Sequence, residues 1–285
     1  MKRSRRRLPQ WVRAGAYRLI SMGRRLTWRG RKLPDFVIIG AQKTGTSSLF
    51  RYLRQHPQLR VSFRKEVHFF DGGLDPDADD FRKGQAWYRS HFPWKGSVAD
   101  GQKVFEASPL YVFNPLAAKR IAELLPDAKL ILVLRDPVER AISHYFHEVR
   151  KGREPLPLME ALQKEEERLA PALASEDYKS YEFIHYSYKS RGLYGEQLAR
   201  YLEHFSMERI LILSSEDMFA DPQSTLRQVF EFVGVDPEFW VGNLRPSNTG
   251  WNRHPIEPPV YAYLQDYFRA PNQALYELIG RDLGW

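Results

Sequence analysis

The hydrophobic and polar positions of this chain change period many times along its length. Short, uninterrupted runs of β-forming apolar residues, typical of strands buried on both faces of a parallel sheet, alternate with stretches of helical period. The pattern predicts strands at 35–40, near 60–69, at 103–107, at 129–134 and at 209–214. It predicts helices at 45–56, near 79–91, and at 115–125, 137–151, 155–169, 195–205, 222–234 and 258–280. Such alternation indicates the α/β class: a single P-loop-like domain with a central parallel sheet flanked by helices on both faces.

The first strand–turn–helix unit, PDFVIIGAQKTGTSSLFRYL at residues 34–53, has the composition of an anion site. Gly40 and Gly45 let the backbone approach a ligand closely, and free N–H groups at the helix start can point at phosphate oxygens. The turn also carries one ammonium and several hydroxyl groups, those of Lys43, Thr44, Thr46, Ser47 and Ser48. A Walker A loop places Lys directly after its last Gly. Here Thr46 holds that position, so the unit predicts a site for a different phosphate-like group, or else a plain structural turn.

A second unit of the same kind, KLILVLRDPVERAISHYFH at residues 129–147, predicts a second anion contact. The Asp-Pro pair after Arg135 suits the start of a helix, so Arg135 leaves the carboxyl end of a strand and Ser143 lies on the next helix. Ligands of open α/β sheets collect at such strand ends. Arg135 and Ser143 are therefore predicted to hold a second phosphate, away from the first loop. The alternative for Arg135 is a surface ion pair with Asp136 or Glu139.

With both motifs in place, the chain resembles the sulfotransferase family that uses 3′-phosphoadenylyl sulfate (PAPS), in particular the branch of the heparan sulfate N- and 3-O-sulfotransferases and their bacterial relatives. The similarity covers residues 34–285 and continues, in order, in KEVHFFD (65–71), EASPLYVFNP (106–115), RGLYGEQLARYLEHF (191–205), ILILSSEDMFADP (210–222) and the closing segment from His254. The resemblance implies PAPS as sulfuryl donor. Because a sulfuryl group carries less charge than a phosphoryl group, no metal is expected.

The resemblance also assigns the donor site residue by residue. The 5′-phosphosulfate loop falls on Gln42, Lys43, Thr44, Gly45, Thr46 and Ser47, and the 3′-phosphate site on Arg135 and Ser143. A segment that closes over the nucleotide in relatives matches Gly250, Trp251, Asn252, Arg253 and His254. Within it, Trp251 would stack on adenine and Arg253 would contact the 3′-phosphate. The alternative for Trp251 is a core side chain.

Sulfuryl transfer needs in-line positioning, a base for the acceptor proton and positive charge on the leaving phosphate. In KEVHFFD, Glu66 follows a strand-like run, where partial removal from water would raise its pKa towards a value useful for a base. The family places its catalytic base at this Glu. His68, on the same strand face, would orient Glu66 or the acceptor hydroxyl, and Lys43 would neutralise the bridging oxygen. Asp71 would hold His68 or contact substrate, unless the segment is merely a charged edge strand.

Departures from the family leave the acceptor open. Ser47 stands where the 3-O-sulfotransferases carry Arg, as in the N-sulfotransferase form, whereas KEVHFFD is closer to the 3-O form. Ala107 stands where the animal heparan enzymes have Lys, and a shorter loop replaces their late disulfide hairpin. The predicted acceptor is therefore a hydroxyl or amine of a glycan, glycolipid or other lipid-linked molecule.

The basic charge belongs to one end of the chain. Of 43 Lys and Arg, 12 lie in residues 1–33 without any Asp or Glu, so the remainder has 31 basic against 35 acidic residues. This predicts a basic tail (1–33) before a sulfotransferase domain (34–285). The mixture of Trp, Leu and Arg in this tail is typical of an interfacial helix on anionic lipid. The alternative is a solvated basic segment that packs loosely on the domain. The segment is too charged to span a bilayer or to act as a signal peptide. No basic-aromatic stripe elsewhere suggests nucleic acid.

The chain contains no Cys, which fits a reducing compartment. We therefore expect a bacterial cytoplasmic protein, with peripheral contact at the inner membrane face if the tail binds lipid. Two other function classes compete with the sulfotransferase. A P-loop-type ATP-dependent kinase would require Mg²⁺ and the missing Walker lysine, and a non-catalytic nucleotide-binding membrane-surface protein would not need Glu66.

Overall fold

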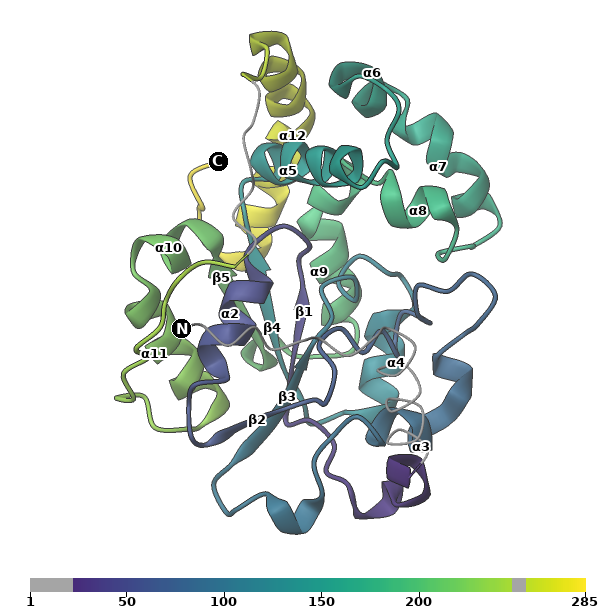
Figure 1. Ribbon diagram of the computed structural model, residues 1–285. Coiled ribbons are helices and arrows are strands. Elements are labelled where there is room, and N and C mark those ends of the chain that lie inside the picture. Colours follow the sequence, from purple (N-terminus) through teal and green to yellow (C-terminus); the bar gives the residue numbers. More distant parts are fainter. Residues whose placement is uncertain (1–22, 248–254) are drawn as a thin grey trace, which may run out of the picture.

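The computed structural model describes residues 23–247 and 255–285, which fold around one five-stranded parallel sheet (Figure 1). Its strands are β1 (Phe36–Gly40), β2 (Leu59–Val61), β3 (Lys103–Ala107), β4 (Lys129–Leu134) and β5 (Ile210–Ser214). They lie in the order β2-β3-β1-β4-β5, and every neighbouring pair is parallel. The predicted α/β class and parallel sheet are confirmed, with β1 in the centre.

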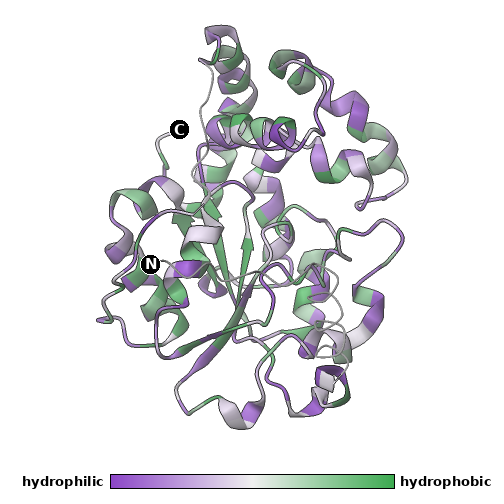
Figure 2. Cartoon of the chain, in the orientation of Figure 1, coloured by the Kyte–Doolittle hydropathy of each residue, from purple (hydrophilic) through white to green (hydrophobic). Residues whose placement is uncertain are grey.

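Helices cover both faces of the sheet, because successive residues of a strand point to opposite sides. Phe36 and Ile38 pack with α2 (Thr46–Leu53), α10 (Ser215–Ala220) and α11 (Pro222–Val233). Val37 and Ile39 pack against the other set, which comprises α3 (Gly84–Arg89), α4 (Ala117–Leu124) and α9 (Tyr194–Leu202). The central strands, buried between these layers, are coloured as hydrophobic in Figure 2.

A further group of helices stands beyond the carboxyl ends of the strands (Figure 1). The group consists of α5 (Pro137–Arg150), α6 (Leu158–Gln163), α7 (Glu165–Ala174), α8 (Tyr181–His185) and the first part of α12 (Pro258–Ile279), whose last turns pack with α9 through Leu275. Val138 and Ile142 of α5 share an apolar core with Leu264 and Phe268 of α12. The predicted helix 155–169 is two helices, α6 and α7, which meet at Lys164. This group therefore covers the carboxyl ends of the strands, which is where ligands bind in open α/β sheets.

The predicted strand near 60–69 is wrong beyond Val61. The backbone leaves the ladder at Phe63, whose N–H donates to His91 O at 2.6 Å, and returns at Glu66, whose N–H donates to Ala107 O at 3.0 Å. Glu66 and His68 both adopt positive φ angles, 58° and 56°. The segment after Val61 is therefore an irregular loop beside β3. The prediction that Glu66 and His68 lie on the same face of a strand is wrong.

The described end of the basic segment packs on the domain. The guanidinium of Arg24 donates to the carbonyls of Ser90 and Phe92 at 2.6 and 2.7 Å, and that of the buried Arg31 donates to Phe92 O at 3.0 Å. Residues 1–22, which hold most of the predicted interfacial helix, lie outside the described residues. Within the part of the chain that the structure describes, no helix has the length and apolar character needed to cross a bilayer.

Candidate active site

The loop between β1 and α2 is shaped by its glycine and its hydroxyl groups. Gly45 caps α2 with φ of 96°, a backbone angle that favours glycine, and a Cβ there would lie 2.6 Å from Cε of Met218, so that side chain of α10 would have to shift. The hydroxyl of Thr44 is buried and donates to Ala41 O at 2.8 Å. Thr44 thus supports the loop from within, and the start of α2 faces the site with the positive end of its dipole.

Lys43 stands among positive charges. Burial lowers the pKa of this ammonium to about 8. Three guanidinium groups act in the same direction, those of Arg150, Arg135 and Arg140. Such an excess of positive charge is unfavourable unless an anion is bound. The surroundings of Lys43 therefore favour the phosphate-like ligand that the sequence predicts.

The two predicted anion motifs meet in space. Nη1 of Arg135 donates to Lys43 O at 3.3 Å, and Nη2 donates to the Glu139 carboxylate at 3.2 Å. Arg135 therefore forms the ion pair with Glu139 that the sequence offered as the alternative, and it also contacts the loop between β1 and α2. Ser143 and His147 follow Glu139 at intervals of four residues, so they lie on the same face of α5. The predicted phosphate ligands Arg135 and Ser143 are thus related through this face of α5, since Arg135 contacts Glu139 on it.

One ammonium joins the loop to the predicted base. Nζ of Lys65 donates to the Ser47 hydroxyl at 3.0 Å and also to the Glu66 carboxylate. Nδ1 of His68 lies 2.6 Å from Oδ2 of Asp71, and its Nε2 lies 3.8 Å from Oε2 of Glu66. Ser47, Lys65, Glu66, His68 and Asp71 therefore form one continuous polar chain. It begins at the loop between β1 and α2 and ends in the core.

The expected rise in the pKa of Glu66 is wrong. Burial does act to raise this pKa, but the hydrogen bond from His68 and the charge of Lys65 outweigh it and lower the pKa to about 2. Burial likewise acts to lower the pKa of His68, but Asp71 and then Glu66 raise it to about 10. At neutral pH the site therefore holds an ionised Glu66, a weak base while Lys65 and His68 contact it, beside a protonated His68.

Asp71 is placed to hold His68. Its side chain is fully buried, one oxygen contacts His68 and the other accepts the Gly73 N–H at 3.1 Å. Of the two roles that the sequence left open for Asp71, this geometry favours positioning. Glu106 supports the same segment from below, since Ser108 donates to Glu106 at 2.9 Å and accepts the His68 N–H at 3.3 Å.

Replacing Asp71 by Asn should lower the pKa of His68 from about 10 towards its ordinary value of 6.5, because the variant loses the largest charge that raises it. A raised histidine pKa stabilises the fold below pH 6.5, and this contribution is lost as the pH rises towards 10. In Asp71→Asn this stabilisation of the fold should be smaller and should be lost at a lower pH. NMR titration of His68 measures the shift. Asp77→Asn, the same change on an exposed side chain, should leave it in place, and an unmoved pKa in Asp71→Asn would contradict the assignment.

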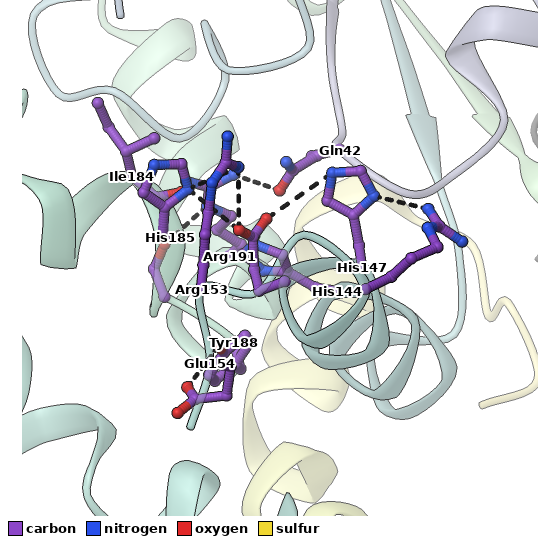
Figure 3. Close-up of polar contacts among 12 residues, drawn as sticks. Gln42, His144, His147, Arg153, Glu154, Ile184, His185, Tyr188 and Arg191 are labelled. Carbon is purple, nitrogen blue, oxygen red and sulfur yellow. Dashed lines mark hydrogen bonds and ion pairs between the residues drawn. The ribbon is translucent and has the colours of Figure 1, made fainter. Parts of the chain in front are cut away.

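Arg191 is a site residue that the sequence did not single out. Its buried guanidinium donates to the Gln42 side-chain oxygen, to the Ser187 hydroxyl at 2.7 Å and to Ile184 O at 2.7 Å (Figure 3). Burial lowers its pKa to about 9. Arg191 thereby fixes Gln42 of the loop between β1 and α2 to the segment around α8. The motif RGLYGEQ contains this Arg, but 149 positions separate it from Gln42, and only the fold brings them together.

Glu148 forms a second link that the sequence did not indicate. The buried carboxylate on α5 lies 3.1 Å from Arg153 and 3.2 Å from His185. His144 and His147, on its own helix, approach it at 3.6 and 3.8 Å. Burial acts to raise the pKa of Glu148, but these partners, His144 first, hold it well below its usual range. The ionised carboxylate joins α5 to α8.

Two sequence predictions are not tested by this geometry. Gly250, Trp251, Asn252, Arg253 and His254 lie outside the described residues. The last described residue before them, Ser247, donates its N–H to the Ser48 hydroxyl at 2.8 Å, in the first turn of α2. Among residues 23–247 and 255–285, no three His, Asp or Glu side chains are grouped to hold a metal ion. The expectation that no metal is needed stays a prediction.

Comparison with known proteins identifies the class. The family model of the sulfotransferase domain matches residues 33–246. The chain therefore belongs to the sulfotransferase domain family, and the enzyme class predicted from its motifs is confirmed. A crystal structure of a sulfotransferase from Alicyclobacillus acidocaldarius has 35% sequence identity and a TM-score of 0.71, and the alignment covers 88% of this chain and 98% of that one.

Curated relatives place the chain near the branch that its motifs resemble. Heparan sulfate glucosamine 3-O-sulfotransferase 3A1 of Mus musculus is 32% identical over 277 residues, which cover 90% of this chain and 65% of that protein. Bifunctional heparan sulfate N-deacetylase/N-sulfotransferase 4 of Mus musculus is 30% identical over 87% of this chain and 30% of its own length. This chain thus spans less than two thirds of either relative.

Proposed function

We propose that this protein transfers a sulfuryl group from PAPS to a hydroxyl or amine of a glycan, free or linked to a lipid. The observation that carries the proposal is the position of Lys65, whose ammonium contacts both Ser47 of the phosphosulfate loop and Glu66. A group held by the loop would lie within reach of the base. The names of the 3-O- and N-sulfotransferase relatives support a glycan acceptor.

The donor would be held at two places, and it would supply the activated sulfuryl group. The start of α2, Lys43 and the hydroxyls of Thr46 and Ser47 would hold the phosphosulfate, since N–H groups, an ammonium and the helix dipole all favour an anion. Arg135 would leave Glu139 for the 3′-phosphate, and Ser143 would add a hydroxyl donor. Residues 250–254 are proposed to close over the nucleotide.

On the acceptor side, Glu66 would take the proton from the attacking hydroxyl. Its low pKa depends on Lys65 and His68. Once Lys65 turns to the sulfonate oxygens, Glu66 loses part of this support, so its pKa would rise and it would become a stronger base. The oxygen of the acceptor would bond to sulfur as the bond from sulfur to the bridging oxygen breaks, and Lys43 would neutralise the departing bisphosphate.

Calorimetric titration separates this proposal from a kinase. We expect tight binding of adenosine 3′,5′-bisphosphate without Mg²⁺ and weak binding of Mg-ATP, because the Walker position of the loop is occupied by Thr46. A preference for Mg-ATP would overturn the sulfotransferase proposal. Binding of the bisphosphate without transfer to any acceptor would favour the non-catalytic interpretation.

We also propose a reducing, cytoplasmic location, which the absence of Cys from all 285 residues supports. The basic segment 1–33 would add contact with anionic membrane. Arg24 and Arg31 are engaged with backbone carbonyls of the domain, so the lipid contact would fall to residues before them. Vesicle sedimentation of the full chain and of a chain lacking residues 1–22 tests this, and equal binding of the two would exclude the tail as the membrane contact.

A further inference from the structure

A buried arginine connects α8 with the loop that follows β1. Arg191 is 3% exposed, and each nitrogen of its guanidinium has a partner. Nε donates to the Ser187 hydroxyl at 2.7 Å, and Nη2 donates to Ile184 O at 2.7 Å and to Phe183 O at 3.3 Å. The remaining nitrogen, Nη1, donates to the side-chain oxygen of Gln42. Arg191 is therefore held by α8 and the residues after it, and it turns one N–H group towards the loop.

We propose that Arg191 is a positioning residue of the donor site. It holds Oε1 of Gln42, so that the amide nitrogen, Nε2, donates a hydrogen bond to the phosphosulfate group of the donor. The inference rests on the proposed function and deepens it, because it assigns one atom of Gln42 to the anion and gives a role to a residue that the sequence did not single out. It is supported by the chemistry of the contact, the access to Nε2, the charge of Arg191 and the packing around it.

The chemistry of the two groups fixes the orientation of the Gln42 amide. A guanidinium carries five N–H donors and no acceptor, so only the oxygen of a neighbouring amide can accept from it. With Oε1 turned to Arg191, Nε2 lies on the other side of the planar amide group (Figure 3). The polar group that Gln42 offers to a ligand is therefore a donor. Such a group suits phosphate or sulfonate oxygens and does not suit a cation.

Nε2 of Gln42 is accessible to a ligand. The residue is partly exposed, and no other described residue accepts a hydrogen bond from this nitrogen. Nor is Nε2 buried, in contrast to the unpaired nitrogens of His144. A donor that faces solvent and is already held in place can bind an anion at little cost in conformational entropy.

The positive charge of Arg191 is not neutralised by a direct contact. Its partners are neutral oxygens, and no carboxylate of the described residues forms an ion pair with it. Burial lowers the pKa of Arg191 to about 9, so the guanidinium is still charged at neutral pH. A charged donor on Oε1 polarises the amide and strengthens Nε2 as a donor. The charge of Arg191 thus acts through Gln42 beside Lys43, and an anion in the loop would be stabilised by both cations.

The packing around Arg191 keeps its guanidinium in place. The central carbon of the guanidinium lies 4.9 Å from the ring centroid of Phe113, which stacks on Phe183 with centroids 4.5 Å apart. Phe113 belongs to the loop after β3, and Phe183 belongs to α8. A cation confined by an aromatic ring and by fixed acceptors has little freedom to turn away from Gln42. Arg191 can therefore set the orientation of the amide.

Gln42→Glu distinguishes a donor role of the amide from a purely structural contact. The new carboxylate keeps an oxygen for Arg191 and pairs with its charge, so the thermal midpoint of unfolding should not fall. It also replaces Nε2 by a second oxygen, which would repel the anion of the donor. Gln42→Ala should weaken donor binding about tenfold, through loss of one hydrogen bond to a charged group. Gln42→Glu should bind the donor more weakly still.

Calorimetry without acceptor measures this with two ligands, adenosine 3′,5′-bisphosphate and PAPS. Weaker binding of both would place Nε2 at the 5′-phosphate, and weaker binding of PAPS alone would place it at the sulfuryl group. Gln228→Glu, the same change on an exposed residue of α11, should bind both ligands as the unmodified chain does. If Gln42→Glu bound both ligands as tightly as this control, the inference would be overturned.

A double-mutant cycle tests whether Arg191 acts through Gln42. Arg191→Lys keeps the charge but not the planar fork, and it should weaken donor binding roughly 3–10-fold. In a chain that already carries Gln42→Ala, the same change should have no further effect. Ser187→Ala removes another partner of Arg191 but leaves Oε1 of Gln42 held, so it should retain full affinity. Equal losses with and without the Gln42 side chain would contradict the positioning role.

The inference and the proposed function fail differently. If the unmodified chain binds neither adenosine 3′,5′-bisphosphate nor PAPS, the donor site is refuted and with it the proposed function. If the unmodified chain binds them and Gln42→Glu binds them equally well, only the inference falls. This comparison also decides the matter if Arg191→Lys does not fold, because Gln42→Glu leaves Arg191 and its contacts with α8 in place.

Discussion

Replacement of Glu66 by Gln should lower kcat for sulfuryl transfer by about 10²–10⁴-fold, the range attributed to a positioned general base. The amide has nearly the same shape, but it cannot accept the proton of the acceptor hydroxyl. Affinity for adenosine 3′,5′-bisphosphate should be retained, because Lys43 and Arg135 remain. Single-turnover kinetics with labelled PAPS would measure the chemical step separately from binding.

The matched control for this variant is Glu203→Gln, the same change on an exposed residue at the end of α9, which should transfer at the unmodified rate. If Glu66→Gln kept kcat within a few-fold of the unmodified chain, Glu66 would not be the base. A rate loss together with a loss of bisphosphate affinity would instead indicate that the variant disturbs the loop through Lys65.

Replacement of Arg135 by Ala should weaken binding of adenosine 3′,5′-bisphosphate by about 10–150-fold. Hydrogen bonds to charged groups contribute about 1.5–3 kcal/mol each, and tenfold in affinity corresponds to about 1.4 kcal/mol. The structure adds a compensating effect, since Arg135 must give up Glu139, at 3.2 Å, before it can bind phosphate. The expected loss therefore lies towards the lower end, and calorimetry would measure it.

Arg269→Ala is the control for Arg135→Ala, because it removes the same charge from an exposed position on α12. Its affinity for the bisphosphate should match that of the unmodified chain. If Arg135→Ala bound as tightly as this control, the ion pair with Glu139 would be the full role of Arg135. The double variant Arg135→Ala with Glu139→Ala would then show the same affinity as either single variant.

The sequence predicted the centre of the fold well because the physical signal there is local. β1 and β4 are buried on both faces, so their apolar runs are uninterrupted, and each is followed at once by the residues that end the strand and begin a helix. Gly45 and the Asp-Pro pair before α5 act within a few residues of their own position. Such patterns need no knowledge of the rest of the chain.

The site could be predicted only in part, because several of its properties depend on distant contacts. Phe63 leaves the sheet to reach His91, which an alternation pattern cannot reveal. The pKa of Glu66 is set by Lys65 and by the Asp71-supported His68, and burial alone predicts the wrong direction. The contact of Arg191 with Gln42 likewise depends on the fold. Residue types were thus predictable, whereas their charge states and couplings were not.

The strand order has a consequence for how such an enzyme can diversify. Arg135, the proposed ligand of the 3′-phosphate, follows β4, and the proposed phosphosulfate loop follows the central β1. The N–H of Glu66 donates to Ala107 O at the end of β3. On this proposal the nucleotide would lie towards the β4 side of β1 and the acceptor towards the β3 side. Under the proposed roles, substitutions in residues 62–91 that leave the Lys65–Ser47 contact in place are expected to change acceptor choice without disturbing the nucleotide side. Donor use and acceptor choice would then be separable in evolution, and a new acceptor could be acquired without rebuilding the donor half.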